Sequence, residues 1–402
     1  MTLPVPLARL LEPPDSFDAR PALAALVALA RDEGASDLHL NPGEGGVALL
    51  LRRDGVLEDR GQLPRRAYDR LLVGLKNLAH LASYKHSIPQ DGRLELEGTE
   101  IRVATAPTHF GEKAVLRLVQ TGFRGLELEE LGFRARELER LRRVVDRPQG
   151  LILATGPSGS GKTTTLFAAL RWLHQGYRER LGAELAVVTL EDPIELVEPR
   201  FTQTPIHPER GMTFATGLRS LLRQDPEVIL VGEIRDPETA RAAVQTSLTG
   251  HRVLSTLHAR DSLGVLPRLL ELGVEPYLLG AALEGVLYQR LVRRLCPACR
   301  VEAEAPPDLE AERRALGLPG GPCWEPRGCP TCRGSGYAGR GAVPEILEVD
   351  DSLRQGILDR VPQVELRRRA RETGWVSLRQ AALERVAEGF TSYGEVNRVV
   401  PA

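Results

Sequence analysis

The chain contains one run whose residue types and spacing suit the binding of phosphate groups. It reads Gly156-Pro-Ser-Gly-Ser-Gly161-Lys162-Thr163, with four residues between two glycines and a lysine directly after the second. This is the P-loop pattern. Its glycines let backbone N–H groups close around phosphate oxygens, and a helix that begins there adds positive potential. The run therefore predicts a site for nucleotide phosphates.

The polar side chains of this run have different expected tasks. Lys162 would reach the β- and γ-phosphates, and the Thr163 hydroxyl would hold Mg²⁺. An apolar run, 151–154, precedes the pattern and a helical stretch, 164–174, follows it, which is the strand–loop–helix context that the motif needs. The residues expected to bind nucleotide are Gly156, Ser158, Gly159, Ser160, Gly161, Lys162, Thr163 and Thr164.

Two carboxylates follow other apolar runs and are candidates for metal and water chemistry. Glu191 comes after the run 186–190, and Glu233 comes after the run 228–231. A nucleotide hydrolase needs carboxylates for its metal ion and for the attacking water. Open α/β sheets place ligands beyond the carboxyl ends of their strands. Acidic residues at strand ends are also often simply solvated, so a surface position without a catalytic role stays possible for both glutamates.

Two histidines flank a further apolar run. His251 precedes the pair Val253–Leu254, and His258 follows it. An imidazole N–H could donate to a γ-phosphate. Composition alone leaves a purely structural role equally open for each ring.

Four of the five cysteines form two Cys-x-x-Cys pairs. The pairs are Cys296 with Cys299 and Cys329 with Cys332, and 29 residues separate them. Each pair can hold one edge of a thiolate tetrahedron, so together they predict a closed structural Zn²⁺ site. A redox pair or free thiols are the alternatives. Cys323 has no partner at ligand spacing and is expected to be an unpaired thiol.

The elements that must position these residues change in character along the chain. Before residue 121, a helical stretch, alternating strands, a turn at 54–55 and a second helix predict a small α/β domain. Its expected elements are a helix over 21–31, a strand over 47–51, a helix over 65–82, a hairpin of 93–96 with 101–104, and a strand over 114–118.

From residue 136 a charged helix is followed by short continuous apolar runs that alternate with helical stretches. Such runs are typical of strands buried on both faces of a parallel sheet with right-handed crossovers. A cysteine region and a charged helical tail follow. The predicted division is 1–33 (N-terminal helical segment), 34–121 (small α/β domain), 122–135 (linker), 136–292 (α/β core), 293–345 (cysteine module) and 346–402 (helical region).

Composition excludes several classes of protein. The 402 residues carry a net charge of −1, which argues against a strongly basic surface for nucleic acid. No apolar run approaches the ~18 residues of a membrane span. The first residues lack the basic start and apolar core of a signal peptide. We therefore expect a cytoplasmic protein that does not bind nucleic acid directly.

The order of the motifs resembles that of the type II secretion and type IV pilus assembly ATPases (GspE/PilB type), which belong to the secretion superfamily of P-loop ATPases. The resemblance runs from about residue 35 to the end of the chain. It rests on the segments Ala35–His39, Pro89–Arg93, Gly111–Arg117, Glu191–Glu195, Leu222–Asp236, Thr249–His258, Gln289–Arg293 and Gly334–Gly341.

This resemblance implies a RecA-like P-loop ATPase domain with a mostly parallel sheet. A small PAS-like α/β domain would precede it, and a Cys₄ zinc module and a helical C-terminal region would follow. It further implies a homohexamer at the inner face of the membrane, which it would reach through a platform protein and the secretion or pilus machinery. The ring would use ATP, Mg²⁺ and Zn²⁺ to power assembly of a secretion pseudopilus, a type IV pilus or a DNA-uptake filament.

The resemblance also implies roles for individual residues. Glu233 would act at the Mg²⁺–water position and Glu191 would activate water. His258, with His251, would contact the γ-phosphate side. Arg102 and Arg117 match positions at which the family supplies arginines to the nucleotide. A further candidate for the same task is Arg219.

Two features bear on which member of the family this is. The cysteine module favours assembly or secretion over pilus retraction. About 33 residues precede the Ala35 motif, where secretion members usually carry a further N-terminal domain, and this leaves the membrane coupling open. The alternatives are a nucleic-acid translocase with a zinc ribbon, and a nucleotide-binding scaffold without useful hydrolysis.

Overall fold

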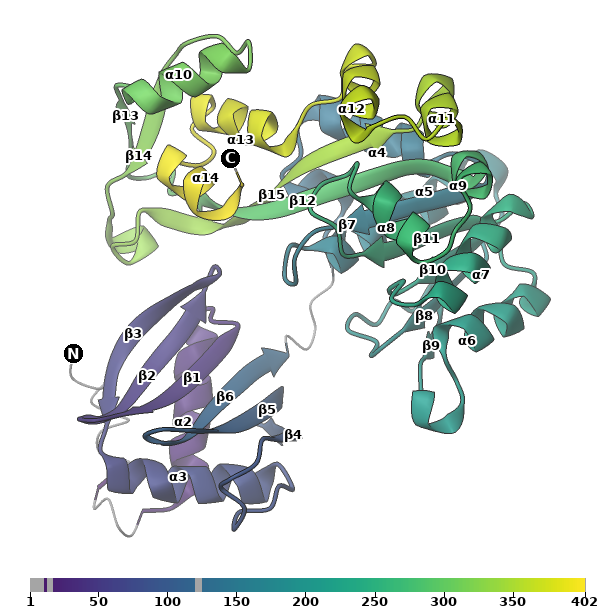
Figure 1. Ribbon diagram of the computed structural model, residues 1–402. Helices are drawn as coiled ribbons and strands as arrows, with labels where there is room; N and C mark the ends of the chain where they lie inside the picture. Colours follow the sequence, from purple (N-terminus) through teal and green to yellow (C-terminus); the bar gives the residue numbers. More distant parts are fainter. Residues whose placement is uncertain (1–10, 13–16, 120–124, 402) are drawn as a thin grey trace. The chain divides into compact units, whose positions relative to one another are not determined.

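The computed structural model describes residues 11–12, 17–119 and 125–401. The proline-rich start of the chain and residues 120–124, where the expected linker begins, lie outside the described part. The chain divides into two compact units, Met1–Arg124 and Gly125–Ala402. We call them the N-terminal unit and the C-terminal unit and describe each by itself (Figure 1). Among the described residues, no helix is both long and apolar enough to cross a bilayer.

Within its described residues, the N-terminal unit has a six-stranded antiparallel sheet and two helices. Its elements are α2 (Ala19–Asp32), β1 (Asp37–Gly43), β2 (Gly46–Arg53), β3 (Val56–Leu63), α3 (Arg65–Leu78), β4 (Gln90–Leu96), β5 (Thr99–Thr108) and β6 (Gly111–Val119). The strand order is β3-β2-β1-β6-β5-β4, so the first and last strands of the chain segment meet in the centre. The predicted hairpin is confirmed, since β4 and β5 pair antiparallel.

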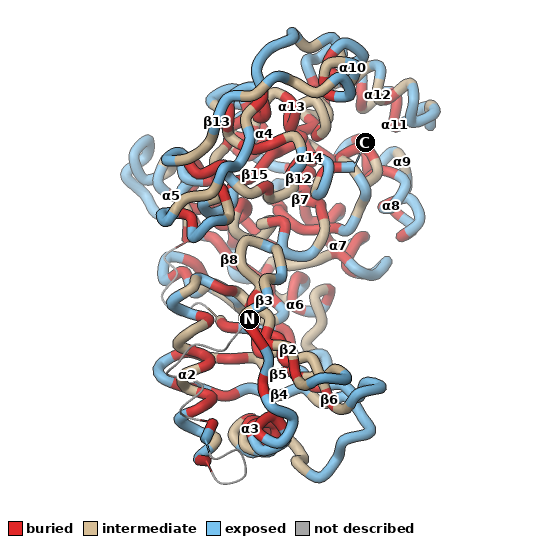
Figure 2. Tube along the Cα trace, turned by 90° about the vertical axis from the view of Figure 1, so that its left-hand side faces the viewer, coloured by how far each residue is buried: buried red, intermediate tan, exposed pale blue. Residues whose placement is uncertain are grey.

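The core of this unit lies between the helices and the sheet. Along β2, Val47, Leu49 and Leu51 are buried and alternate with more exposed residues. The apolar stripes of α2 and α3 join the same core through residues such as Leu26 and Leu71. Figure 2 shows this burial as a one-sided pattern along α2. The period of two in the strands and of about 3.6 in the helices brings these faces together.

Helix α3 is shorter than predicted, because it ends at Leu78 and not at residue 82. His80, two residues after the end of the helix, has a φ of 57°, which lies in the left-handed region. The N–H of Leu81 then donates to the carbonyl of Lys76 at 2.8 Å, which closes the helix end.

The C-terminal unit is built on a seven-stranded sheet of order β15-β12-β7-β11-β10-β8-β9. Its strands are β7 (Gly150–Thr155), β8 (Val187–Glu191), β9 (Thr202–Pro205), β10 (Val228–Val231), β11 (Arg252–Leu257), β12 (Leu283–Leu295) and β15 (Tyr337–Glu348), with β13 (Arg300–Ala303) and β14 (Cys323–Pro326) in a separate hairpin. Every pairing in the large sheet is parallel except that of β12 with β15. The mostly parallel sheet that the apolar runs predicted is therefore confirmed.

Helices cover both faces of this sheet (Figure 1). The helices in the described part of this unit are α4 (Ala135–Val145), α5 (Lys162–Leu181), α6 (Phe214–Leu221), α7 (Pro237–Leu248), α8 (Val265–Glu271), α9 (Pro276–Ala282), α10 (Pro307–Ala315), α11 (Asp351–Leu358), α12 (Gln363–Glu372), α13 (Leu378–Ala387) and α14 (Tyr393–Val399). Of these, α10, α13 and α14 share a core with β14 and the outer parts of β12 and β15. Along β7, Leu151 and Leu153 pack with α6, α7 and α8, whereas Ile152 and Ala154 pack with α4 and α5. Because both faces are covered, β7 and β10 are buried along their whole length.

The strands β12 and β15 form a long antiparallel ribbon that belongs to the sheet at one end and supports the cysteine region at the other. Ten residue pairs join the two strands, from Gly285 with Glu348 to Leu295 with Tyr337. Tyr288, Val292 and Val343 of this ribbon share a core with α13 and α14. The predicted boundaries at 292/293 and 345/346 therefore fall inside continuous strands.

Candidate functional site

The phosphate loop, residues 156–163, follows the end of β7 and runs into the first turn of α5, which is the context that the motif predicted. Gly156 has a φ of 140° and Gly161, the N-cap of α5, has a φ of 87°. A Cβ at Gly156 would lie only 2.7 Å from the carbonyl oxygen of Gln289. The first glycine is thus required both by its backbone angle and by the close approach of β12. Ser158 and Gly159 at the tip are exposed.

Lys162 bends back over the loop on which it stands. Its Nζ donates to the carbonyl oxygens of Gly156 at 2.9 Å and Pro157 at 3.1 Å. Burial lowers the pKa of Lys162, and the carboxylates of Glu233 and Glu195 act in the opposite direction. The ammonium group therefore lies in a partly dry position within reach of two acids, where its charge acts strongly on any anion bound to the loop.

Glu233 and His258 meet at the same edge of the sheet. The His258 Nε2 lies 3.1 Å from Glu233 Oε1, and its Nδ1 lies 3.3 Å from the carbonyl oxygen of Gly156. Glu233 follows β10, His258 follows β11, and these two strands are neighbours. The other oxygen of Glu233 accepts from Arg235 Nε at 2.7 Å. One imidazole thus connects the phosphate loop with the acid that follows β10.

Glu191 ends β8, the strand on the other side of β10. One of its oxygens accepts hydrogen bonds from Thr189 Oγ1 at 2.6 Å and from Gln203 Nε2 at 2.8 Å. Burial raises the pKa of the Glu191 carboxyl, and the nearby charge of Glu195 adds to the rise, while the two hydrogen bonds oppose it. A buried carboxyl of this kind is suited to taking a proton.

Two residues that the sequence placed with the loop are not brought to it within this chain. His251 precedes β11, and the N–H of Gly150 at the start of β7 donates to its carbonyl. It therefore lies at the amino ends of the strands, about 20 Å along a six-residue strand from the carboxyl edge. Arg219 on α6 pairs instead with Glu238 on the first turn of α7, at 2.8 Å.

The two arginines of the N-terminal unit lie directly opposite each other on neighbouring strands. Arg102 of β5 is paired in register with Arg117 of β6. Arg117 Nε donates to Asp37 Oδ1 at 2.8 Å, yet two thirds of its side chain (67%) is exposed. Both arginines line a hollow of about 560 Å³ together with Arg93 and Asp91. Asp37 lines the same hollow, so three guanidinium groups stand beside two carboxylates there.

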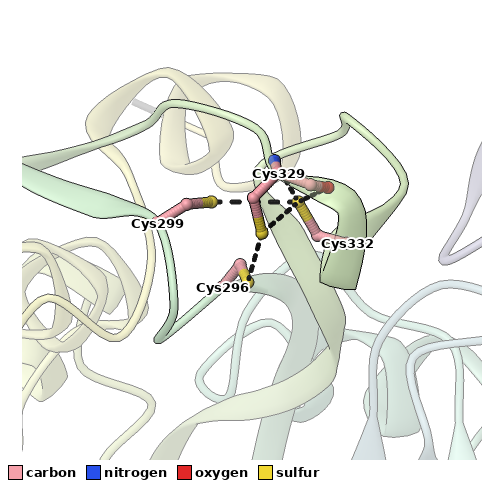
Figure 3. A group of neighbouring side chains, drawn as sticks. All are labelled: Cys296, Cys299, Cys329 and Cys332. Carbon is pink, nitrogen blue, oxygen red and sulfur yellow. Dashed lines mark hydrogen bonds between the residues drawn. The ribbon is translucent and has the colours of Figure 1, made fainter.

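The four paired cysteines converge at the end of the β12–β15 ribbon (Figure 3). Their sulfur atoms all lie within 4.8 Å of one another. Cys296 and Cys329 are 3.9 Å apart, Cys299 and Cys332 are 3.8 Å apart, and Cys329 and Cys332 are 3.7 Å apart. Zn–S bonds of ~2.3 Å in a tetrahedron require sulfur separations of about 3.8 Å. The four thiols therefore fit a zinc ion.

The surroundings of Cys329 and Cys332 favour the thiolate, because nearby N–H groups lower the pKa of both, whereas burial raises the pKa of Cys299. Burial opposes ionisation of Cys332, but the backbone N–H groups of Cys329 and Gly336, each 3.1 Å from its sulfur, outweigh that effect and lower its pKa to about 6. Cys323 lies outside the cluster, on β14, with its sulfur 3.4 Å from the Ala303 carbonyl oxygen. Burial raises the pKa of this thiol. Its separation from the four paired cysteines agrees with the prediction.

Sequence reasoning missed one residue that touches the phosphate loop. Gln289 on β12 is completely buried and donates from Nε2 to the carbonyl oxygen of Ser160 at 2.7 Å. The signal was available, because a polar amide stands inside the apolar stretch 283–292. A buried amide of this kind requires a partner, and the sequence alone did not show which.

Comparison with known proteins shows to which family the chain belongs. The family model for "Type II/IV secretion system protein" matches residues 17–398. The chain belongs to this family. It is 43% identical to "Type II secretion system protein E" of Klebsiella pneumoniae over 96% of this chain and 77% of that protein. It is 41% identical to "Type IV pilus assembly ATPase PilB" of Thermus thermophilus over 90% of this chain and 41% of that protein.

Two solved structures of other proteins share the fold. The ATPase DotB of Legionella pneumophila superposes with a TM-score of 0.69 at 21% identity, over 96% of both chains. The pilus retraction motor PilT with bound ADP gives a TM-score of 0.61 at 22% identity, over 94% of this chain and 96% of that one. This member of the type II/IV secretion family thus has the architecture that its motifs implied.

Proposed function

We propose that this chain hydrolyses ATP to ADP and phosphate and acts as a homohexameric ring. The observation that carries the proposal is the meeting of Lys162, Glu233 and His258 around the carbonyl of Gly156. A cation, an acid and a donor at the open end of a phosphate loop are the groups that phosphoryl transfer to water requires. The family membership of the chain supports the same reaction.

Each residue has a part in this reaction. Thr163 and Glu233 would hold Mg²⁺, which neutralises charge on the β- and γ-phosphates when it is bound. Lys162 would leave its contacts with the loop carbonyls and bind the terminal phosphates, and His258 would donate to the same side. Glu191 would accept the proton of the attacking water, for which its dry position is suited. The remaining loop residues would bind through backbone N–H groups.

The names of the relatives support a proposal about the machinery that the ring serves and its place in the cell. Proteins named for type II secretion and for type IV pilus assembly match along most of this chain. We propose that the ring powers assembly of a secretion pseudopilus, a type IV pilus or a DNA-uptake filament from the cytoplasmic side of the inner membrane. It would reach the membrane through a platform protein. The four-cysteine cluster would hold a structural Zn²⁺.

The experiment is ATP turnover per chain across a wide range of protein concentration, with Lys162→Ala as the blank. A specific rate that rises steeply with concentration is expected, because a neighbouring subunit would complete the site. A rate that stays flat down to concentrations at which the chain is monomeric would contradict the ring. No rate above the blank would favour a scaffold. Stimulation by DNA with a steep salt dependence would favour a translocase.

A further inference from the structure

Gln289 makes two side-chain hydrogen bonds, and both go to the segment that carries the phosphate-binding residues. Its Nε2 donates to the carbonyl oxygen of Ser160 at 2.7 Å, and its Oε1 accepts from Thr165 Oγ1 at 3.0 Å. Ser160 and Thr165 are themselves buried. These two partners stand on either side of Lys162 and Thr163 in the sequence. One side chain therefore fastens both ends of that short segment.

The orientation of this amide follows from its partners. A carbonyl oxygen can only accept a hydrogen bond, so the NH₂ group must face Ser160. The amide oxygen is then left for the hydroxyl of Thr165, which can donate. An apolar side chain of the same size could form a hydrogen bond with neither the Ser160 carbonyl nor the Thr165 hydroxyl. Gln289 is fully buried, and each of these bonds lies out of reach of water that could replace it.

The backbone of β12 fits the same loop. The carbonyl oxygen of Gln289 lies 2.7 Å from the position that a Cβ on Gly156 would take, and its Nε2 lies 3.0 Å from that of Gly161. The first and last glycines of the loop thus both rest against one residue of β12. This contact explains why neither position has room for a side chain.

We propose that Gln289 is the positioning residue that aims the phosphate loop at its ligand. In a trans peptide the C=O and the following N–H point in opposite directions. Holding the Ser160 carbonyl toward β12 therefore turns the N–H of Gly161 away from the core, toward the side on which phosphates bind. The proposal rests on the proposed nucleotide-binding function. It predicts that Gln289 acts on nucleotide affinity beyond its effect on stability.

The test measures binding of ATP and ADP, the melting temperature and the zinc content of four variants. Gln289→Leu should weaken nucleotide affinity about tenfold or more, because the Ser160 carbonyl loses its donor. Gln289→Met, closer in length, should do the same. Adding Thr165→Val to Gln289→Leu removes the unpaired hydroxyl, so the melting temperature should recover in part while the affinity stays low.

Leu383→Ala is the matched control, because Leu383 is fully buried in the separate core formed with α13 and α14. It should lower the melting temperature and leave the affinity unchanged. Affinities of both Gln289 variants within about threefold of the wild type, or affinities that simply follow melting temperature across all variants, would overturn the proposal. If Gln289→Leu does not fold, the Gln289→Met variant decides. A wild-type protein that binds no nucleotide would instead overturn the proposed function.

Discussion

Glu191 and Glu233 end neighbouring strands but have different surroundings. Glu233 is paired with His258 and Arg235. Glu191 is buried, and its carboxylate accepts hydrogen bonds from the neutral groups of Thr189 and Gln203. Active sites often separate the tasks of two acids by placing them in different environments. Here the paired acid is suited to the metal and the dry acid to the proton.

The first prediction concerns Glu191→Gln. We expect turnover to fall by about 100-fold or more, because the variant cannot accept a proton. Nucleotide affinity should be retained. Since burial raises the pKa of Glu191, the wild-type rate should begin to fall on acidification at a higher pH than an ordinary glutamate would give. Steady-state rates from pH 5 to pH 9 for both proteins check this.

The stability of the same variant gives the control. A carboxyl whose folded pKa is raised costs stability above its unfolded pKa, where the folded state must carry a buried charge, and the cost disappears at low pH. Glu191→Gln should therefore melt at or above the wild-type temperature at pH 8. Loss of turnover together with a large loss of melting temperature at pH 8 would contradict the role assigned to this acid.

At the scale of elements, the phosphate loop depends on the strand beneath it. Gly156→Ala would place a methyl group 2.7 Å from the Gln289 carbonyl oxygen, at a φ of 140°. We expect a loss of unfolding free energy of about 2 kcal/mol or more, and loss of nucleotide binding. Gly176 lies within α5 with nothing within 4 Å of its added Cβ. Gly176→Ala should therefore raise stability by about 0.5–1 kcal/mol. Denaturant titration of both variants checks the contrast.

The cysteine cluster provides a prediction about a metal. Wild-type protein purified in reductant should contain about one zinc per chain, since four thiols complete one tetrahedral site. Cys296→Ser with Cys299→Ser should remove the metal and lower the melting temperature, because metal binding and local folding are coupled. Cys323→Ser is the matched control and should keep the zinc. Well under one zinc in the wild type would contradict a metal site.

The sequence predicted the elements whose apolar residues form a clear pattern, either continuous or periodic. The runs 151–154 and 228–231 lie within β7 and β10, and the P-loop motif located the turn between β7 and α5. The strand β12 was not predicted, because Gln289, Arg290 and Arg293 interrupt its apolar pattern. Gln289 and Arg293 contact partners that are distant in sequence, Ser160 and Glu395, whereas Arg290 donates to the hydroxyl of nearby Tyr288. Local pattern cannot reveal such pairings.

The candidate site was predictable to a similar extent. An acid or a histidine beside an apolar run marked each candidate residue. Which edge of the sheet that residue occupies depends on the direction of the strand in the fold. His251 and His258 flank the same strand, and the structure brings only His258 to the loop. The bond from Gln289 to Ser160 spans 129 positions and depends on the sheet order. The sequence motifs located the chemistry, whereas the fold determined which of the candidates meet.

At the scale of the whole molecule, Arg102 and Arg117 belong to a different compact unit from the phosphate loop. A cation supplied by a second unit would make hydrolysis depend on how that unit is placed, which would couple chemistry to motion. Arg117 is available for such a task, because most of its side chain is exposed although it pairs with Asp37.

The last prediction is that Arg117→Ala folds and binds ATP but turns it over at least about 1,000-fold more slowly, as for arginine fingers elsewhere. Arg31→Ala, also on the N-terminal unit and half-exposed, should keep the wild-type rate.

Burial tends to raise the pKa of Asp37, but the bond from Arg117 outweighs it and lowers that pKa. The pair therefore stabilises the fold above the unfolded pKa of Asp37, and the contribution is lost on acidification. The melting temperatures of wild type and Arg117→Ala should differ at pH 7 and converge near pH 3, whereas unchanged turnover in Arg117→Ala would exclude this arginine from the reaction.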